Sequence, residues 1–284
     1  MLHALSALLI AAGGAVAPIA APAPVSITAK PNVIVVRAKD FSFVVPKSVT
    51  AGLTTFRLVN DGKELHHLSI IKLAKGKTVA QYIDAIKAGG PPPAWATDVG
   101  GPNAALPGRT VEATLSLDAG NYVISCWIPS PGETAPHAMK GMIQALTIVP
   151  TAASVTQAGA AKEPAPDVHL TLVDYGFKFS KPLVAGRQTI HVMNDAGQPH
   201  EVIFFKLAPG KTVQEVNAWI MEKHMQGPPP ATPIDGMAGL ATGRTGSFPA
   251  NLTPGEYGLM CLVPDSKDGK PHTAHGMMTQ VTVK

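Results

Sequence analysis

The chain contains two cysteines, and the residues that follow each of them share one spacing. Each cysteine is followed by ten residues, a histidine, four more residues and a methionine. The loops between cysteine and histidine share little beyond proline and glycine. The shared spacing therefore indicates that these three positions, rather than the loop sequences, are constrained. The two sets are Cys126, His137 and Met142, and Cys261, His272 and Met277.

A further histidine lies upstream of each cysteine, His66 in the first half and His200 in the second. One thiolate, two imidazoles and one thioether are the ligands of a mononuclear electron-transfer copper site, in which the methionine is a weak axial ligand. We therefore expect one copper ion in each half. The predicted ligands are His66, Cys126, His137 and Met142, and His200, Cys261, His272 and Met277.

Two of these assignments have neighbours that compete with them. His67 could replace His66, but the duplication described below pairs His66 with His200. His275 could replace His272, but its counterpart in the first half is a lysine. The spare thioethers Met139 and Met278 are more simply interpreted as loop packing.

The composition favours an all-β chain. Aromatic residues make up 5% and charged residues 15%, and the chain has 27 glycines and 27 prolines. Frequent turn formers between short runs of valine, isoleucine, leucine and threonine are typical of β-sandwiches. The net charge is only +4 and no basic run occurs, which argues against a nucleic-acid partner.

An internal duplication organises the chain into two domains. FRLVND at 56–61 matches IHVMND at 190–195, and KLAKGKTV at 72–79 matches KLAPGKTV at 206–213. A small, polar, proline-flanked segment between the repeats has the composition of a linker. The predicted boundaries are an N-terminal segment 1–30, a first domain 31–150, a linker 151–166 and a second domain 167–284.

Each repeat is expected to contain strands, one short helix and more strands. Apolar residues at helical spacing begin at Val79 and at Val213, and the first of these helices is expected to end at Gly89-Gly90. The strands expected in the first half are 33–37, 54–60, 68–73, 109–115, 122–126 and 145–149.

The N-terminus has the features of an export signal. Residues 4–20 are apolar and small, and an Ala/Pro-rich stretch follows, as in a secretory signal and its processing zone. Gly13-Gly14 and Pro18 interrupt the segment, which disfavours the alternative of an uncleaved anchor. We expect a periplasmic or secreted protein with no stable membrane span after signal removal.

The simplest alternative for two cysteines in an exported chain is that they form one disulfide. Cys126 and Cys261, however, occupy equivalent interior positions of two separate repeats. A bridge needs Cα atoms within ~7 Å of each other. We therefore expect two free cysteines.

The segments NDAGQPHEV at 194–202 and YGLMC at 257–261, followed by PHTAHGM at 271–277, resemble the cupredoxin family of blue copper proteins. The resemblance implies two tandem Greek-key β-sandwiches, each with one inserted helix and with copper near one end, and electron transfer as the usual function. The ten-residue loop is longer than in the small family members. Where those proteins often place asparagine after the first histidine, this chain has His67 and Glu201.

The favoured function is therefore that of an exported one-electron carrier whose partner is a redox protein. Alternatives are copper storage, delivery or tolerance, with a copper donor or acceptor as partner, and a metal-free structural module. A two-domain copper oxidase or nitrite reductase would need additional histidines beside the cysteines. Those neighbours are Ser125, Trp127, Met260 and Leu262, and no His-x-His pair occurs, so we do not expect an enzyme.

Overall fold

The computed structural model describes residues 31–88, 92–151, 163 and 165–284. The proposed export segment 1–30, the glycines at which the first helix was expected to end and most of the linker lie outside these residues. Across the described ranges, no helix is both long enough and apolar enough to cross a membrane.

The first half folds into two facing sheets. One contains β1 (Asn32–Lys39), β2 (Ser42–Val44), β4 (Gly52–Asn60) and β7 (Thr110–Leu117). The other contains β3 (Ser48–Thr50), β5 (Ser69–Leu73), β6 (Ala96–Gly100), β8 (Gly120–Ser125) and β9 (Ile143–Val149). In β4, Thr54, Phe56 and Leu58 are buried while Arg57 is exposed. This alternation places one face of the strand in the core.

The second half repeats this order of elements, except that its described residues contain no counterpart of β3. Its first sheet contains β10 (Val168–Val173), β11 (Gly176–Phe179), β12 (Gly186–Asn194) and β15 (Thr245–Leu252). Its second sheet contains β13 (His200–Leu207), β14 (Ala231–Leu240), β16 (Gly255–Met260) and β17 (Met278–Val283). The expected all-β fold of β-sandwich type is confirmed.

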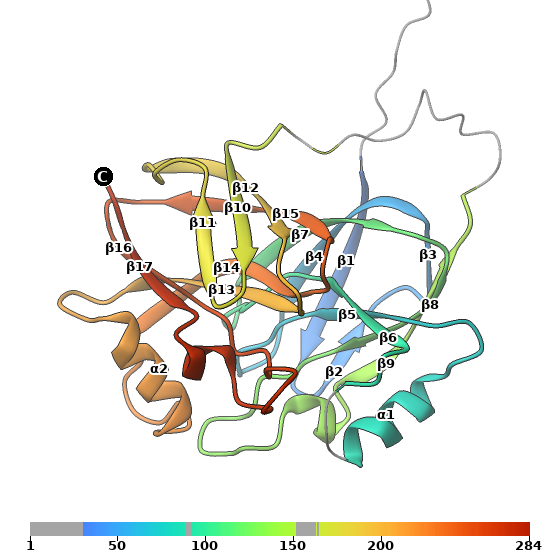
Figure 1. Cartoon of the computed structure of the whole chain (residues 1–284). Coiled ribbons are helices and arrows are strands. Elements are labelled where there is room, and N and C mark those ends of the chain that lie inside the picture. The colour runs from blue at the N-terminus through green and yellow to red at the C-terminus, as the bar shows by residue number, and fades with distance from the viewer. Residues whose placement is uncertain (1–30, 89–91, 152–162, 164) are drawn as a thin grey trace, which may run out of the picture.

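Each half contains one short helix after a matching capping box. In α1 (Val79–Lys87), Thr78 accepts a hydrogen bond from the backbone of Gln81, whose side chain accepts one from the backbone of Thr78. Thr212 and Glu215 do the same for α2 (Val213–Met221). These reciprocal bonds satisfy free N–H groups of the first helical turn. Both helices lie on the same side of the molecule, the lower side in Figure 1.

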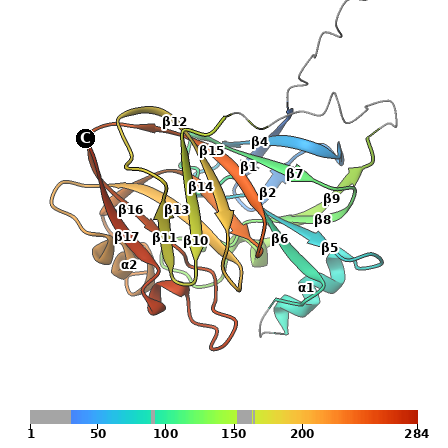
Figure 2. The ribbon, with the colours of Figure 1, turned by 45° about the horizontal axis from the view of Figure 1, so that its top comes forward.

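The sheets of the two halves join edge to edge. β7 pairs with β15 through Leu115 and Gly246, and β6 pairs with β14 through Val99 and Leu240. The described strands thereby form one sheet of eight strands and one of nine (Figures 1 and 2). Buried apolar side chains of both halves form one continuous cluster. No pattern in the sequence predicted this pairing between the halves.

Two glycines allow the backbone to approach closely beside the first histidine of each half. Gly101 has a φ of +141°, and a Cβ placed on it would lie 1.8 Å from the carbonyl oxygen of Leu68. Gly236 has a φ of +154°, and its Cβ would lie 2.1 Å from the carbonyl oxygen of Val202. Only glycine accommodates this conformation and this contact. The segment carrying the first histidine is thus held against β6 or β14.

Candidate metal centre

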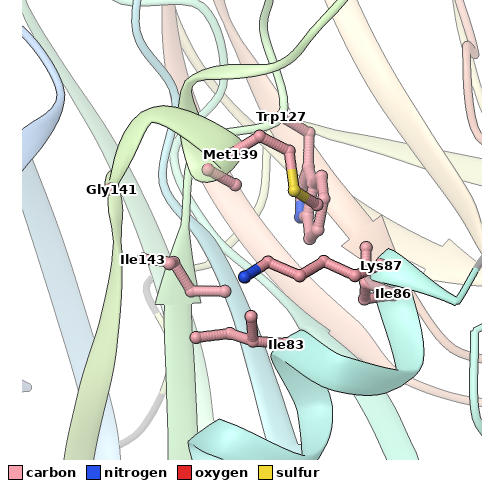
Figure 3. Close-up of a pocket in the computed structure, with 8 residues that line it drawn as sticks. Ile83, Ile86, Lys87, Trp127, Met139, Gly141 and Ile143 are labelled. Carbon is pink, nitrogen blue, oxygen red and sulfur yellow. The ribbon is translucent and has the colours of Figure 1, made fainter.

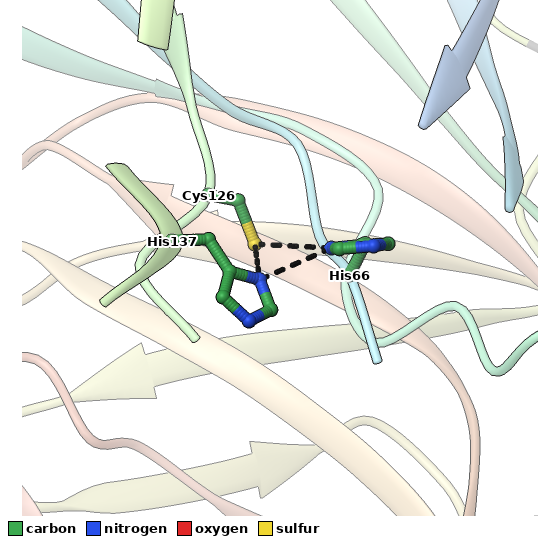
Figure 4. Close-up of side chains that lie close together, drawn as sticks. All are labelled: His66, Cys126 and His137. Carbon is green, nitrogen blue, oxygen red and sulfur yellow. Dashed lines mark hydrogen bonds between the residues drawn. The ribbon is translucent and has the colours of Figure 1, made fainter. Parts of the chain in front are cut away.

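Three side chains of the first half converge on one buried point (Figure 4). The Nδ1 atoms of His66 and His137 lie 3.1 Å apart, and Cys126 Sγ lies 3.9 Å and 3.5 Å from them, respectively. All three residues are completely buried. Cys126 directly follows β8, and His137 begins a short 3₁₀ helix, so the residues reach this point from different segments.

Backbone hydrogen bonds hold the loop between Cys126 and His137. The N–H of His137 donates to the carbonyl of Ile128 at 2.9 Å, and the N–H of Cys126 donates to the carbonyl of Met142 at 3.1 Å. Met142 in turn donates its N–H to the carbonyl of His137 at 3.0 Å. The loop and the segment carrying Met142 therefore form one hydrogen-bonded unit. Met142 is completely buried, and its role as an axial ligand stays a prediction.

The second half contains the same arrangement. The Nδ1 atoms of His200 and His272 lie 2.8 Å apart, and Cys261 Sγ lies 3.8 Å and 3.2 Å from them, respectively. The N–H of Cys261 donates to the carbonyl of Met277 at 3.2 Å, and that of Met277 donates to the carbonyl of His272 at 3.0 Å. All these residues are buried. Met277 as a fourth ligand also stays a prediction.

One histidine of each neighbouring pair lies in a triad. His66, not His67, contributes a ring nitrogen to the first triad, and His272, not His275, contributes one to the second. The ring of His275 instead lies 3.2 Å from Asp268 near the surface. Both cysteines are free and buried, as expected.

The dimensions of both triads fit a metal ion. A point equidistant from the three donor atoms lies about 2 Å from each of them in either half, close to the ~2.0–2.3 Å of metal bonds to imidazole and thiolate. Thiolate with imidazole suits copper among the common metals. Each triad could therefore hold one copper ion.

Burial sets the protonation of the donors. It lowers the pKa of His66 and of His137, and it lowers the pKa of His272 to about 4. The imidazoles are therefore neutral at pH 7, as metal binding requires. Burial also raises the pKa of the Cys126 thiol to about 12. Without a positive charge nearby the sulfur keeps its proton, and metal binding would release it.

Carboxylates orient the outer nitrogens of the first pair of histidines. His66 Nε2 lies 3.1 Å from Asp40, and His137 Nε2 lies 3.0 Å from Glu64. Such partners fix the ring orientation and leave the inner nitrogen free for a metal. In the second half the corresponding distances are longer, 3.5 Å from His200 to Asp174 and 3.7 Å from His272 to Asp265. The second triad is thus held less tightly by its surroundings.

The residue after each first histidine ties two loops together. The N–H of Trp127 donates to His67 Nε2 at 2.8 Å, and the N–H of Leu262 donates to Glu201 Oε1 at 2.9 Å. Both side chains are buried, and burial lowers the pKa of His67 to about 4 and raises that of Glu201 to about 7. His67 and Glu201 stand at the position after the first histidine, where small cupredoxins often have asparagine. Each of them connects the segment that carries the first histidine to the segment that follows the cysteine.

The sequence analysis did not identify the surrounding carboxylates. Asp40 and Glu64 lie 26 and 73 residues from the histidines that they contact. Asp40 has a counterpart in Asp174, so comparison of the two repeats could have selected it. Glu64 corresponds to Gln198, and no signal of that kind existed for it.

An apolar hollow is lined in part by residues that directly follow Cys126 and His137 in the sequence (Figure 3). It has a volume of about 170 Å³ and lies between α1 and the 3₁₀ helix that begins at His137. Trp127, which follows Cys126, and Met139 line one side, and Ile83 and Lys87 line the other. The hollow thus provides an apolar surface close to two of the triad residues in sequence.

Comparison with known proteins adds structural similarities of low score. No protein-family model and no curated protein match the sequence. The reduced auracyanin of Roseiflexus castenholzii is 23% identical over 43% of this chain and 100% of that one, with a TM-score of 0.28. Auracyanin A of Chloroflexus aurantiacus, a blue copper protein, is 21% identical over 42% of this chain and 99% of its own chain, with a TM-score of 0.30. The blue copper oxidase of Nitrosomonas europaea is 14% identical over 90% of this chain and 86% of its own chain, with a TM-score of 0.25.

These overall similarities are small, so the class of fold rests on features of this chain. Each half has two packed sheets, a cysteine at the end of a strand of the second sheet, and two histidines that meet it. Together these features define, in each half, a two-sheet β-sandwich that carries a candidate copper site.

Proposed function

We propose that the chain is an exported protein that transfers single electrons through two type 1 copper sites, one in each half. The observation that carries this proposal is the convergence of one thiol and two neutral imidazoles in each half, completely buried and tied by backbone hydrogen bonds. Copper held there would supply one-electron exchange between Cu(I) and Cu(II).

The residues of the chain would make this exchange easy. His66 and His137 are kept in orientation by Asp40 and Glu64, so the donors need to move little when the charge at the site changes. Burial excludes water from the sulfur of Cys126. The amide N–H of His67 points to the same sulfur at 3.5 Å, an interaction that tunes redox potential in thiolate sites.

Within this proposal the chain acts as a carrier rather than an enzyme. In the described part of the chain, the remaining cluster of potential metal ligands is Asp265, Asp268 and His275, which contains a single histidine. Histidine-rich sites next to a cysteine, where a small substrate would bind a second copper, are thus missing from the described residues. For a partner, we propose a redox protein that docks at the apolar hollow beside Trp127.

The test uses the purified full chain loaded with Cu(II). We expect an intense visible band from the thiolate–Cu(II) interaction that ascorbate bleaches and ferricyanide restores over repeated cycles. Loss of copper to a chelator, without reversible bleaching, would instead support copper storage or delivery. A chain that binds no copper would contradict both.

Export is tested separately, because it rests on the sequence of residues 4–20. We expect the protein to be recovered from the periplasm or the medium, with an N-terminus that begins after this segment. Recovery of the full-length chain in the cytoplasm would contradict export without affecting the metal sites.

A further inference from the structure

Asn103 links the surroundings of the two candidate metal sites. It follows β6, is almost completely buried, and lies between the residues that come after each first histidine. Its Oδ1 lies 3.3 Å from His67 Nδ1, and its Nδ2 lies 3.2 Å from Glu201 Oε2. One side chain of the first half thus contacts both loop ties.

The hydrogen bonds have a consistent pattern of donors and acceptors that converges on the Glu201 carboxyl group from both sides. The N–H of Trp127 donates to His67 Nε2, so this nitrogen carries no proton and Nδ1 of the neutral ring does. His67 Nδ1 therefore donates to Asn103 Oδ1, and Asn103 Nδ2 donates to Glu201. Glu201 uses its other oxygen to accept the N–H of Leu262. Each of the donors in this series of hydrogen bonds has an acceptor.

The two residues that Asn103 joins also contact a cysteine sulfur each, through their backbone. The backbone N–H of His67 points to Cys126 Sγ at 3.5 Å, and that of Glu201 points to Cys261 Sγ at 3.4 Å. Hydrogen bonds to a ligating sulfur are among the features that set the redox potential of a thiolate site. The two residues on either side of Asn103, His67 and Glu201, therefore also contact the two cysteine sulfurs through their own backbone N–H groups.

The fold does not require asparagine at this position. Asn103 comes two residues after Gly101, and the equivalent position, two residues after Gly236, is Ala238. Ala238 is also buried in a strand. An alanine therefore satisfies the corresponding position in the same architecture.

We propose that Asn103 couples the two metal sites, so that the state of one changes the redox potential of the other through His67, Asn103 and Glu201. This inference rests on the proposed function. Linked hydrogen bonds polarise one another in a low-dielectric interior. A change of charge at Cys126 alters the bond from His67, which alters the bonds of Asn103 and Glu201 and finally the environment of Cys261. Such coupling is reciprocal.

The test compares midpoint potentials, measured by spectroelectrochemistry of the visible bands, in copper-loaded full chains. Cys126→Ala and Cys261→Ala each leave one site and provide its potential when the other site is empty. In the wild type we expect the midpoint potential of each site to differ from its single-site value by about 40 mV. For a one-electron reduction this corresponds to about a fivefold change in the equilibrium constant. In Asn103→Ala, with its own single-site chains, the displacement should shrink by at least half.

Asp235→Asn is the control for a general disturbance of the contact between the halves. Asp235 is buried in β14 and accepts the N–H of Glu112 from β7 at 3.3 Å, but it lies outside the hydrogen-bonded chain. We expect this variant to keep the full displacement. If Asn103→Ala does not fold, Glu201→Gln replaces it. The glutamine oxygen can still accept the N–H of Leu262, but its amide group then faces the amide of Asn103 as donor to donor.

Two results would overturn the coupling. One is the absence of displacement in the wild type. The other is an equal displacement in wild type and Asn103→Ala, which would mean that Asn103 only joins the halves and that any interaction acts through space. A wild type without visible bands would contradict the proposed function itself, so the two failures are distinguishable.

Discussion

The cysteine and the two histidines of each triad differ from ordinary core residues in what burial does to them. A buried imidazole is neutral at physiological pH, and its inner nitrogen is available to a metal. The buried thiol of Cys126, with its raised pKa, is inert until a cation replaces its proton. These side chains are therefore arranged for metal binding rather than for nucleophilic chemistry.

Replacement of one cysteine should remove one site only. In Cys126→Ser the first triad loses its thiolate, while Cys261 remains with His200 and His272. We expect copper content to fall from two ions to one per chain and the visible absorption to fall by about half. Metal analysis with absorption spectroscopy measures this. If the single variant lost all of its colour or none, the assignment of one site to each half would be wrong.

Asp98 should make stability depend on pH. Burial raises its pKa from 3.8 to about 6, so the folded state favours the neutral carboxyl. Its contribution to stability is complete below about pH 4, is lost as the pH rises to about 6, and stays lost above that. We expect a loss on the order of 2 kcal/mol. This is less than the full pKa shift would give, because Asp98 remains partly accessible to solvent, which screens its charge.

Asp98→Asn should therefore raise the free energy of unfolding at pH 7 relative to the wild type. We expect the difference between variant and wild type to shrink as the pH falls from 6 to 4. Urea unfolding at several pH values measures it. A difference that does not change with pH would show that Asp98 is not responsible.

Residue types and spacing in the sequence were enough to place the cysteine and histidines of each triad. Cysteine, histidine and methionine are scarce, and the same intervals occur twice. Asn103 could not be found in this way, because it has no counterpart in the second half. Its partner Glu201 lies 98 residues away, and only the packing of the two halves brings them together.

At the level of elements, strand periodicity and the helical faces were sufficient for the main units. The helices beginning at Val79 and Val213 and the six strands expected in the first half are confirmed to within a few residues. β2 and β3 contain three residues each, too few for a pattern, and β6 was also not predicted. Short edge strands take their conformation from their neighbours rather than from their own sequence.

The close backbone approach at Gly101 supports the position of the first histidine. A Cβ at Gly101 would overlap the carbonyl oxygen of Leu68, two residues after His66. We expect Gly101→Ala to lower the free energy of unfolding by more than about 3 kcal/mol and to weaken copper binding at the first site. Chemical unfolding and copper titration measure these effects.

Gly108→Ala is the matched control. Gly108 also has a positive φ, +70°, but a Cβ there would meet nothing within 4 Å. The cost should be only about 1 kcal/mol from backbone conformation, with copper binding unchanged. Equal losses in the two variants would mean that the close approach to Leu68 has no role of its own.

On the scale of the whole molecule, the two halves share sheets and a core. The pairings of β6 with β14 and of β7 with β15 involve few residues, so no sequence pattern could have predicted them. They nevertheless make the apolar cluster continuous. The same packing encloses Asn103 between the two sites.

We therefore expect the copper-free chain to unfold in one cooperative transition. Leu240 is completely buried and pairs with Val99 of the other half. Leu240→Ala should lower the free energy of unfolding by about 2–5 kcal/mol, and calorimetry should show one transition that shifts as a whole. Two separate transitions would show that the halves unfold independently, if Leu240→Ala lowered the midpoint temperature of only one of them.

The central claim, that each half holds a copper ion between one cysteine and two histidines, is tested most directly by anomalous X-ray diffraction at the copper edge from crystals of the copper-loaded chain. The account predicts two anomalous peaks, one about 2 Å from the donor atoms of Cys126, His66 and His137 and one at the same distance from those of Cys261, His200 and His272. Peaks found only elsewhere, such as at Asp265, Asp268 and His275, or no peak at all, would contradict it.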